Sequence, residues 1–223
     1  MEQRRLLLVE GLDDCHVIRA IARAHGIESD STRLENGGFR VTWGPAEVEV
    51  QPVGGYRELL KVVPVQLAIG DREALAVVLD ANDDLGARWQ ALKDRLDRAG
   101  YPALPHRPDP AGTIIQYSHG PRFGVWLMPD NRQAGMIEHF LAFLVPDSDT
   151  LLPRVDAFLA TIPEQERGRF PEARRPKARI HTWLGIQKEP GKPLGQAVTA
   201  RYMDAHCPQV EPFLKWLRAA LVD

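Results

Sequence analysis

Hydrophobic positions along the chain fall into short continuous runs, and the two clearest runs each end in a carboxylate. Residues 6–9 are followed by Glu10, and residues 74–79 are followed by Asp80. Strands that are buried on both faces of a parallel sheet have this continuous apolar character rather than a two-residue alternation. The pattern therefore predicts two central strands, each with an acidic residue at its carboxyl end.

A helical pattern follows each of these strands. Residues 13–25 carry apolar side chains at helical spacing, with Asp13 or Asp14 as the expected N-cap and a glycine after the last turn. Residues 86–99 repeat this plan and also end at a glycine. The order strand, acid, helix, glycine thus occurs twice.

Other segments continue the alternation of strands and helices, which predicts an α/β fold with a mainly parallel central sheet flanked by helices. We expect strands at 47–50, 113–117 and 123–128, and helices at 56–63 and 135–145.

Proline and arginine become frequent from residue 146 onward, and an amphipathic helix at 210–222 closes the chain. We therefore expect an α/β domain at residues 1–145 and a smaller, mostly helical C-terminal part at 146–223 that packs on it.

Composition narrows the class of protein. A chain of 223 residues that is 44% hydrophobic is long enough for one sizeable core. Its net charge of −2 argues against a protein that coats nucleic acid by bulk charge. Two distant cysteines suggest no disulfide framework and favour a cytoplasmic location. No apolar run approaches the ~18 residues of a membrane span, so no membrane partner is expected.

Common phosphate-binding and hydrolase motifs are absent. The segment 185–193 resembles a phosphate-binding loop, but five residues rather than four separate Gly185 from Gly191, and Pro193 stands where such a loop has Ser or Thr. The seven histidines are scattered along the chain, so we interpret His139 and His181 as ordinary polar positions.

Acidic residues remain as the candidate chemistry. The carboxyl ends of parallel strands meet at one edge of a sheet, so Glu10 and Asp80 are expected to lie close together there. Magnesium binds such oxygen ligands, often with a substrate phosphate completing its shell. Four further residues are candidate ligands, namely Asn82, Asp83, Asp130 and Glu138. For Asp13, Asp14 or Asp84 alone, helix capping is the simpler interpretation.

The two strand ends that carry Glu10 and Asp80 resemble the motifs of a known domain family. A strand that ends in "VEGLDD" and a later strand that ends in an Asp-x-Asp-like "DAND" are similar to the Toprim domain of topoisomerases, primases, OLD-family nucleases and ribosomal-RNA maturases. The segments "GVWLMPDNRQAGMIEHFL" and "KARIHTWLGIQKEPGKPLGQAV" resemble an uncharacterised bacterial family of Toprim-related proteins. The Toprim-like part would cover residues 1–145.

The resemblance implies roles for individual residues. Glu10 would be a general acid/base or metal ligand in phosphoryl transfer, and Asp80 the first metal-binding aspartate. Asn82 departs from the pattern because an acid is expected there, although its carbonyl oxygen, Asp83 or Asp84 can take the place of that acid. OLD-type relatives have a further acid and a lysine, for which the candidates are Glu138 or Asp130, and Lys177, Lys188 or Lys192.

A basic stretch near the C-terminal part could contact a phosphate backbone, with Trp183 nearby for base stacking. It consists of Arg174, Arg175, Lys177 and Arg179. The alternative is a solvated surface with the tryptophan in the core.

Two functions follow from the sequence. The first is a phosphoryl-transfer protein that depends on Mg²⁺ or Mn²⁺, most simply a nuclease acting on DNA or RNA through Glu10, Asp80 and Lys177. The second is a catalytically weakened Toprim-like module that binds nucleic acid or a partner protein, such as an ATPase.

Overall fold

The computed structural model describes residues 4–29, 34–102, 104–167 and 170–223. Within them, seven strands form one sheet in the order β2-β3-β4-β1-β5-β7-β6. The strands are β1 Arg5–Val9, β2 Glu28–Ser29, β3 Phe39–Trp43, β4 Ala46–Pro52, β5 Ala74–Asp80, β6 Thr113–Gln116 and β7 Arg122–Met128. The helices are α1 Leu12–Ala24, α2 Tyr56–Leu67, α3 Leu85–Arg98, α4 Ile137–Phe143, α5 Leu151–Thr161, α6 Glu164–Arg167, α7 Arg175–Gly185, α8 Leu194–Thr199 and α9 Val210–Leu221, with a short 3₁₀ turn, η1, at Glu172–Arg174. The α/β fold expected from the sequence is confirmed.

The centre of the sheet is parallel and its edges are antiparallel. Strand β1 pairs in parallel with β4 and β5, and β5 pairs in parallel with β7. Strands β2, β3 and β6 are added antiparallel at the two edges. The carboxyl ends of β1, β5 and β7 therefore point to the same edge, and the segments after them share that edge.

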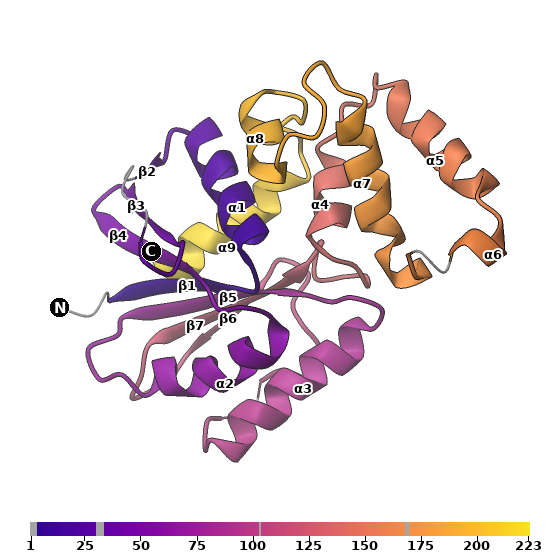
Figure 1. Cartoon of the computed structure of the whole chain (residues 1–223). Coiled ribbons are helices and arrows are strands. Elements are labelled where there is room, and N and C mark those ends of the chain that lie inside the picture. The colour runs from indigo at the N-terminus through magenta and orange to yellow at the C-terminus, as the bar shows by residue number, and fades with distance from the viewer. Residues whose placement is uncertain (1–3, 30–33, 103, 168–169) are drawn as a thin grey trace.

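Both faces of the sheet are buried, which explains the continuous apolar runs. In β1, Leu7 and Val9 pack into one hydrophobic cluster, whereas Leu6 and Leu8 pack into the other. Figure 1 shows α2 and α3 over one face and α1, α4 and α9 on the opposite side. The protein is thus a three-layer α/β/α arrangement around a sheet whose central strands are inaccessible to water.

The helix starts differ in part from the expectation. The N-cap of α1 is Gly11, so the prediction of Asp13 or Asp14 as the N-cap is wrong. The chain enters the helix directly after the glutamate, and the Asp14 side chain accepts a hydrogen bond from the N–H of Gly11 at 2.8 Å. In α3, by contrast, Asp84 is the N-cap and accepts from the N–H of Ala87 at 2.9 Å, as expected.

The C-terminal part is helical and shares its core with the sheet. Helix α9 contacts β7, β5 and β1, and it places Phe213 and Trp216 beside Trp126 of β7. Helices α5 and α6 lie farthest from the sheet in Figure 1. The boundary expected at residues 145 and 146 stays a prediction.

None of the helices in the described residues is both long enough and apolar enough to cross a membrane.

Candidate functional site

The two strand-end acids meet at the carboxyl edge of the sheet. Glu10 directly follows β1, and Asp80 is the last residue of the neighbouring strand β5. The backbone N–H of Asp80 donates to Oε1 of Glu10 at 2.9 Å. The Asp80 carboxylate in turn accepts from the N–H of Ile137, the first residue of α4, at 3.0 Å. Backbone N–H groups thus fix the carboxylates of Glu10 and Asp80 at the carboxyl edge of the sheet, where the sequence placed them.

Asp14 and Glu138, which are buried, join the half-buried Glu10 and Asp80 in a group of carboxylates that we call the acidic cluster (Glu10, Asp14, Asp80 and Glu138). Asp14 is only 7% exposed and Glu138 only 1%. Both interact electrostatically with Asp80. Glu138 was predicted from its position at the border of an apolar helix face, whereas Asp14 was interpreted as a cap. The signal for Asp14 was its place in "VEGLDD", three residues after Gly11, the N-cap of α1.

Burial raises the pKa values of three acids of the acidic cluster, and mutual repulsion adds to the effect for two of them. Burial raises the pKa of Asp14 to about 7, and the charges of Glu10 and Glu138 add to the effect. Burial likewise raises the pKa of Asp80 to about 8, with further contributions from the other three carboxylates. Burial also raises the pKa of Glu10, although the N–H of Asp80 and the charge of Arg88 act in the opposite direction. Removing a carboxylate from water and placing it near others disfavours its charged form.

Lys177 is the lysine that reaches the acidic cluster. It lies in α7, and its Nζ is 3.1 Å from Oε1 of Glu138. Burial acts to lower the pKa of Lys177, but the carboxylates of Glu138, Asp80 and Asp13 together outweigh this effect and the pKa is raised. Of the alternatives expected from the sequence, Lys192 pairs with Glu189, and Lys188 lies in the loop between α7 and α8.

The second oxygen of Glu138 has no partner among the described residues. Its Oε2 is buried and makes no hydrogen bond. A buried carboxylate oxygen without a hydrogen bond is costly, so it marks a position where a further ligand or proton would be stabilising.

The remaining predicted ligands differ in their placement. Asn82 and Asp83 line a pocket next to Glu138, so they lie near the acidic cluster. Asp130 follows β7, but its carboxylate accepts hydrogen bonds from Arg132 and Gln133 within its own turn. Asp130 is therefore occupied locally rather than directed at the other acids.

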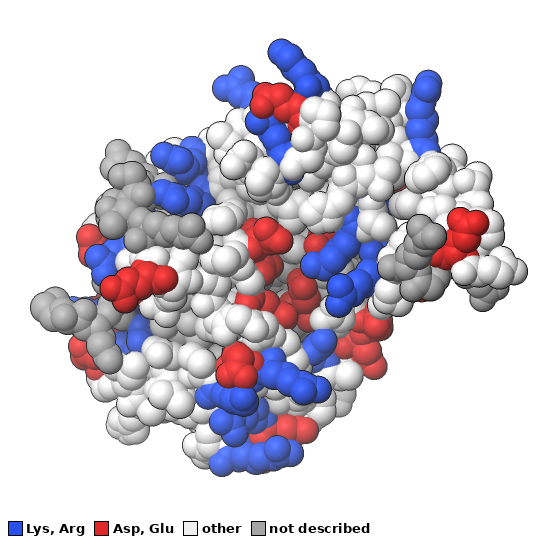
Figure 2. Space-filling model, in the orientation of Figure 1, with Lys and Arg blue, Asp and Glu red and all other residues white. Residues whose placement is uncertain are grey.

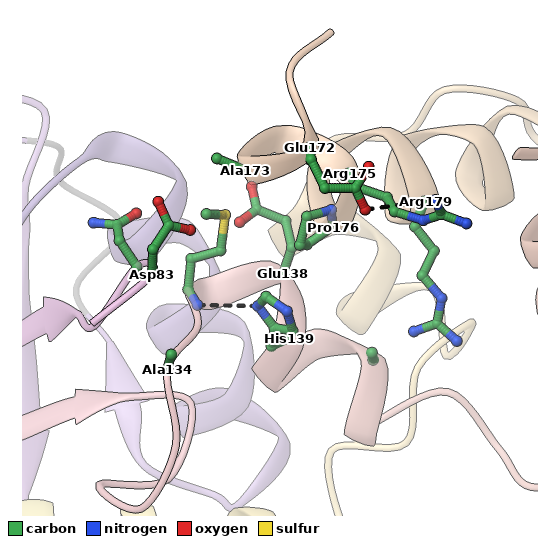
Figure 3. A pocket seen from close by; sticks show the side chains of 12 residues that line it. Asp83, Ala134, Glu138, His139, Glu172, Ala173, Arg175, Pro176 and Arg179 are labelled. Carbon is green, nitrogen blue, oxygen red and sulfur yellow. Dashed lines mark hydrogen bonds and ion pairs between the residues drawn. The ribbon is translucent and has the colours of Figure 1, made fainter. Parts of the chain in front are cut away.

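The pocket has a volume of about 490 Å³ and lies between α4 and α7. Figure 3 shows Asp83 and Glu138 on facing sides of it and Arg175 and Arg179 along α7. Basic and acidic side chains line the same cavity, as do His139 and Met136. Such a mixed lining suits a ligand with charged groups.

The basic stretch is largely engaged within the protein. Arg179 binds Asp156 through two hydrogen bonds, at 2.6 and 2.9 Å. Arg175 pairs with Glu172 at 3.5 Å, and Arg174 is exposed.

The expectation of Trp183 as a stacking side chain is wrong. It is 1% exposed, and its indole N–H donates to Asp149 at 3.1 Å. The apolar face of α7 carries Trp183 into the core, as the alternative interpretation expected.

The carboxylates are coupled but do not form a finished metal centre. Across residues 4–29, 34–102, 104–167 and 170–223, no three or more His, Cys, Asp or Glu side chains are arranged so that they could hold a metal ion together. Figure 2 shows acidic side chains gathered in a hollow at the centre of one face, with basic side chains on its borders. The site for Mg²⁺ or Mn²⁺ stays a prediction.

Solved structures that are similar to the chain include two that align over nearly its whole length. One is the crystal structure of hypothetical protein PH0156 from Pyrococcus horikoshii OT3, with a TM-score of 0.52 and 15% identity over 98% of this chain and 95% of that one. The other is the C-terminal region of the Burkholderia pseudomallei OLD protein, with a TM-score of 0.45 and 15% identity over 99% of each chain. The first supports the α/β fold. No curated protein matches the sequence. The family DUF3226, described as "Protein of unknown function", matches residues 4–222, so the chain belongs to DUF3226.

Proposed function

We propose that this protein is a phosphoryl-transfer enzyme that depends on Mg²⁺ or Mn²⁺ and cuts phosphodiester bonds of DNA or RNA. The observation that carries the proposal is the acidic cluster at the carboxyl edge of the parallel strands. Structural ion pairs would join each acid to a base, but here four buried or half-buried carboxylates share one ion pair, between Glu138 and Lys177, among the described residues. The Toprim resemblance of the sequence supports the same function.

The donor chemistry fits a hard divalent cation. All four side chains offer oxygen ligands, which Mg²⁺ and Mn²⁺ prefer. The partnerless Oε2 of Glu138 is one available ligand atom. Protons on Asp14 and Asp80 offset the repulsion in the free protein, and a cation would replace them. The carboxylates have to turn toward one another to share it, because their present arrangement does not hold an ion.

The residues of the chain have distinct tasks in this proposal. The acidic cluster would hold the ion, which when bound activates a water and neutralises charge on a phosphate. The Asp80 N–H fixes the Glu10 carboxylate in place for proton transfer. Lys177 brings a positive charge to the cluster from α7, where it can bind a substrate phosphate oxygen.

Calorimetric titration with Mn²⁺ tests the proposal. We expect the wild type to bind the ion, and Glu10→Gln and Asp80→Asn to bind it at least about tenfold more weakly, because each removes one charge from the ligand set. Asp97→Asn, which removes an exposed acid from α3, is the matched control and should bind like the wild type.

Cleavage of single- and double-stranded DNA and RNA is then measured with the same proteins. Activity of the wild type that is lost in Glu10→Gln supports the enzyme. A wild type that binds no ion and cuts none of these substrates would show that the proposal is wrong.

A second candidate is a binding module without catalysis. Asn82 favours this binding module, since a neutral amide stands where the resemblance expects an acid. The backbone N–H of Asn82 donates to the carbonyl of Gly135 at 2.6 Å, which fixes the position of this residue. Such a module would bind nucleic acid or a partner protein, such as an ATPase. Oligonucleotide binding without cleavage in Mg²⁺ or Mn²⁺ would select this function over the first.

A further inference from the structure

Arg88 occupies a position that helix electrostatics disfavours. It lies in the first turn of α3, where the helix dipole is positive and acidic residues are the more stable choice. No ion pair and no hydrogen bond from its guanidinium occurs among the residues described. The N-cap Asp84, four residues earlier, instead uses its carboxylate on the N–H of Ala87. Capping or helix stability therefore does not explain Arg88.

The ring of Tyr56 holds Arg88 in place. The guanidinium carbon lies 3.8 Å from the centre of that ring, a close cation–π contact. Tyr56 is the first residue of α2, so it stands at the same sheet edge as Glu10. The Tyr56 hydroxyl is buried and has no hydrogen-bond partner in the described structure. The ring face, rather than the hydroxyl, is thus what positions the guanidinium.

Arg88 lies near the acidic cluster without binding any of its carboxylates. The charge of Arg88 acts on Glu10, so the two groups are near each other, yet the guanidinium is stacked on the ring and not bound to the carboxylate. A guanidinium stacked in this way keeps its N–H donors free for a ligand. Phosphate is the anionic group that such a fork binds best, often through two hydrogen bonds.

A second cation lies in the other helix layer. Lys177 belongs to α7, on the side of α4, whereas Arg88 belongs to α3, below the sheet in Figure 1. Figure 2 shows basic side chains on both borders of the acidic hollow, near α7 and over α2 and α3. A polyanion that crosses the acidic cluster would have a positive charge to meet on each side of it.

We propose that Arg88, held by the ring of Tyr56, binds a phosphate of a nucleic-acid strand that crosses the acidic cluster from α7 to α3. The inference rests on the proposed function for the identity of the ligand. In this arrangement Arg88 and Lys177 bind phosphates on either side of the phosphate at the acidic cluster. The inference therefore assigns both a binding residue and a direction to the path of the strand. The backbone phosphates carry the contact, so binding is independent of base sequence.

Fluorescence anisotropy with a fluorescein-labelled oligonucleotide tests this path, with Ca²⁺ in place of Mg²⁺ to hold back cleavage. We expect Arg88→Gln to weaken binding about tenfold and to lower the slope of log affinity against log salt by about 0.7 for single strands, the effect of one lost phosphate contact. Arg98→Gln, which removes an exposed arginine from the same helix, should leave affinity and slope unchanged.

Substitutions of Tyr56 separate the ring from the hydroxyl. Tyr56→Phe keeps the ring and removes a hydroxyl without a hydrogen bond, so it should bind like the wild type. Tyr56→Leu removes the ring and should weaken binding toward the Arg88→Gln level. Circular dichroism melting of each variant shows whether it is folded, and equal melting temperatures assign the loss to the contact.

The outcomes separate this inference from the proposed function. If the wild type cleaves while Arg88→Gln keeps wild-type affinity and salt slope, the path is wrong and the enzyme stands. If the wild type binds in an Arg88-dependent way but never cleaves, the path stands and the enzyme fails. A wild type that binds no oligonucleotide overturns the path.

Discussion

Asn82 limits the charge that the candidate site can offer a cation. The residue has a left-handed backbone with φ of 50°, which Asn and Asp both tolerate better than most side chains. Its side chain lines the pocket that also contains Asp83 and Glu138. An aspartate at this position would therefore add a carboxylate without a new backbone cost.

We expect Asn82→Asp to tighten Mn²⁺ binding by about tenfold, which corresponds to roughly 1.4 kcal/mol of added attraction. Calorimetric titration measures the change. Asn82→Gly is the neutral comparison, because glycine accepts the same backbone conformation and adds no charge, and it should bind no more tightly than the wild type. Equal affinities for Asn82→Asp and Asn82→Gly would contradict a role for charge at this position.

The acidic cluster should make stability depend on pH in a defined direction. The unfolded pKa of an aspartate is about 3.9, whereas the folded values are about 7 for Asp14 and about 8 for Asp80. The folded protein then binds more protons than the unfolded chain between these values, so the free energy of unfolding falls as pH rises from 4 to 8. Each such carboxyl contributes a slope of up to about 1.4 kcal/mol per pH unit.

Urea unfolding in EDTA across this pH range measures that slope. Asp80→Asn keeps an oxygen for the N–H of Ile137 but cannot ionise, so it should flatten the pH dependence and be more stable than the wild type at pH 8. Asp97→Asn should retain the wild-type slope. The same slope in Asp80→Asn and the wild type would contradict the raised pKa of Asp80.

The sequence predicted those site residues for which helix capping is not an alternative explanation. Glu10 and Asp80 end apolar strands, where a capping role does not account for a carboxylate. Asp14 was missed because an acid in the first turn of a helix is usually a cap, and here it both binds the N–H of Gly11 and lies buried beside other acids. Spacing along the sequence cannot separate these two roles, since burial also depends on elements far along the chain, such as α8, which packs on α1.

At the scale of elements, the sequence predicted the central strands of the sheet but not β2 and β3 at one of its edges. The strands at 39–43 and 28–29 were not predicted. Phe39 and Val41 are buried while Arg40 and Thr42 are exposed, an alternation too short to stand out from loop sequence. Antiparallel pairing with β4 fixes this strand, and that pairing is a property of the assembled sheet.

A close approach of two helices also supports the acidic cluster. Helices α1 and α8 pack together, and a Cβ added at Gly195 of α8 would lie 2.5 Å from the carbonyl oxygen of His16 in α1. Glycine at this position lets α8 rest on the helix that carries Asp14.

We expect Gly195→Ala to destabilise the protein by about 1–3 kcal/mol, the usual cost of overpacking, and to weaken Mn²⁺ binding because α1 must shift. Chemical denaturation and calorimetry measure the two effects. Gly185→Ala in α7 is the matched control, since no atom lies within 4 Å of its added Cβ, and it should be neutral or slightly stabilising. Equal losses in both variants would argue against the α1–α8 contact as the cause.

At the scale of the whole molecule, the sheet depends on the last helix of the chain. Trp216 and Phe213 of α9 are at most 2% exposed and pack on Trp126 of β7. The hydrophobic cluster on that face combines residues of the sheet with residues of the C-terminal helices. The frequency of proline and arginine rises at residue 146, which suggested a boundary there. Amino-acid composition does not show that the helices after this residue cover one face of the sheet.

We therefore expect a fragment of residues 1–145 to remain unfolded or only partly folded, because it leaves one face of the sheet without α9. Circular dichroism, dye binding to exposed apolar surface and the cooperativity of urea unfolding test this against the full chain. A fragment with a sharp unfolding transition would show instead that the α/β part is an independent domain.

The ion pair between Glu138 and Lys177 has a consequence for synthesis of the chain. Glu10, Asp14, Asp80 and Glu138 all leave the ribosome before Lys177, so the acidic cluster is made before the cation that pairs with Glu138. Early compact forms of the chain must keep these acids protonated, hydrated or bound to ions from the surrounding solution. The concentration of divalent cations during translation would then influence when the sheet closes as well as what the finished protein can do.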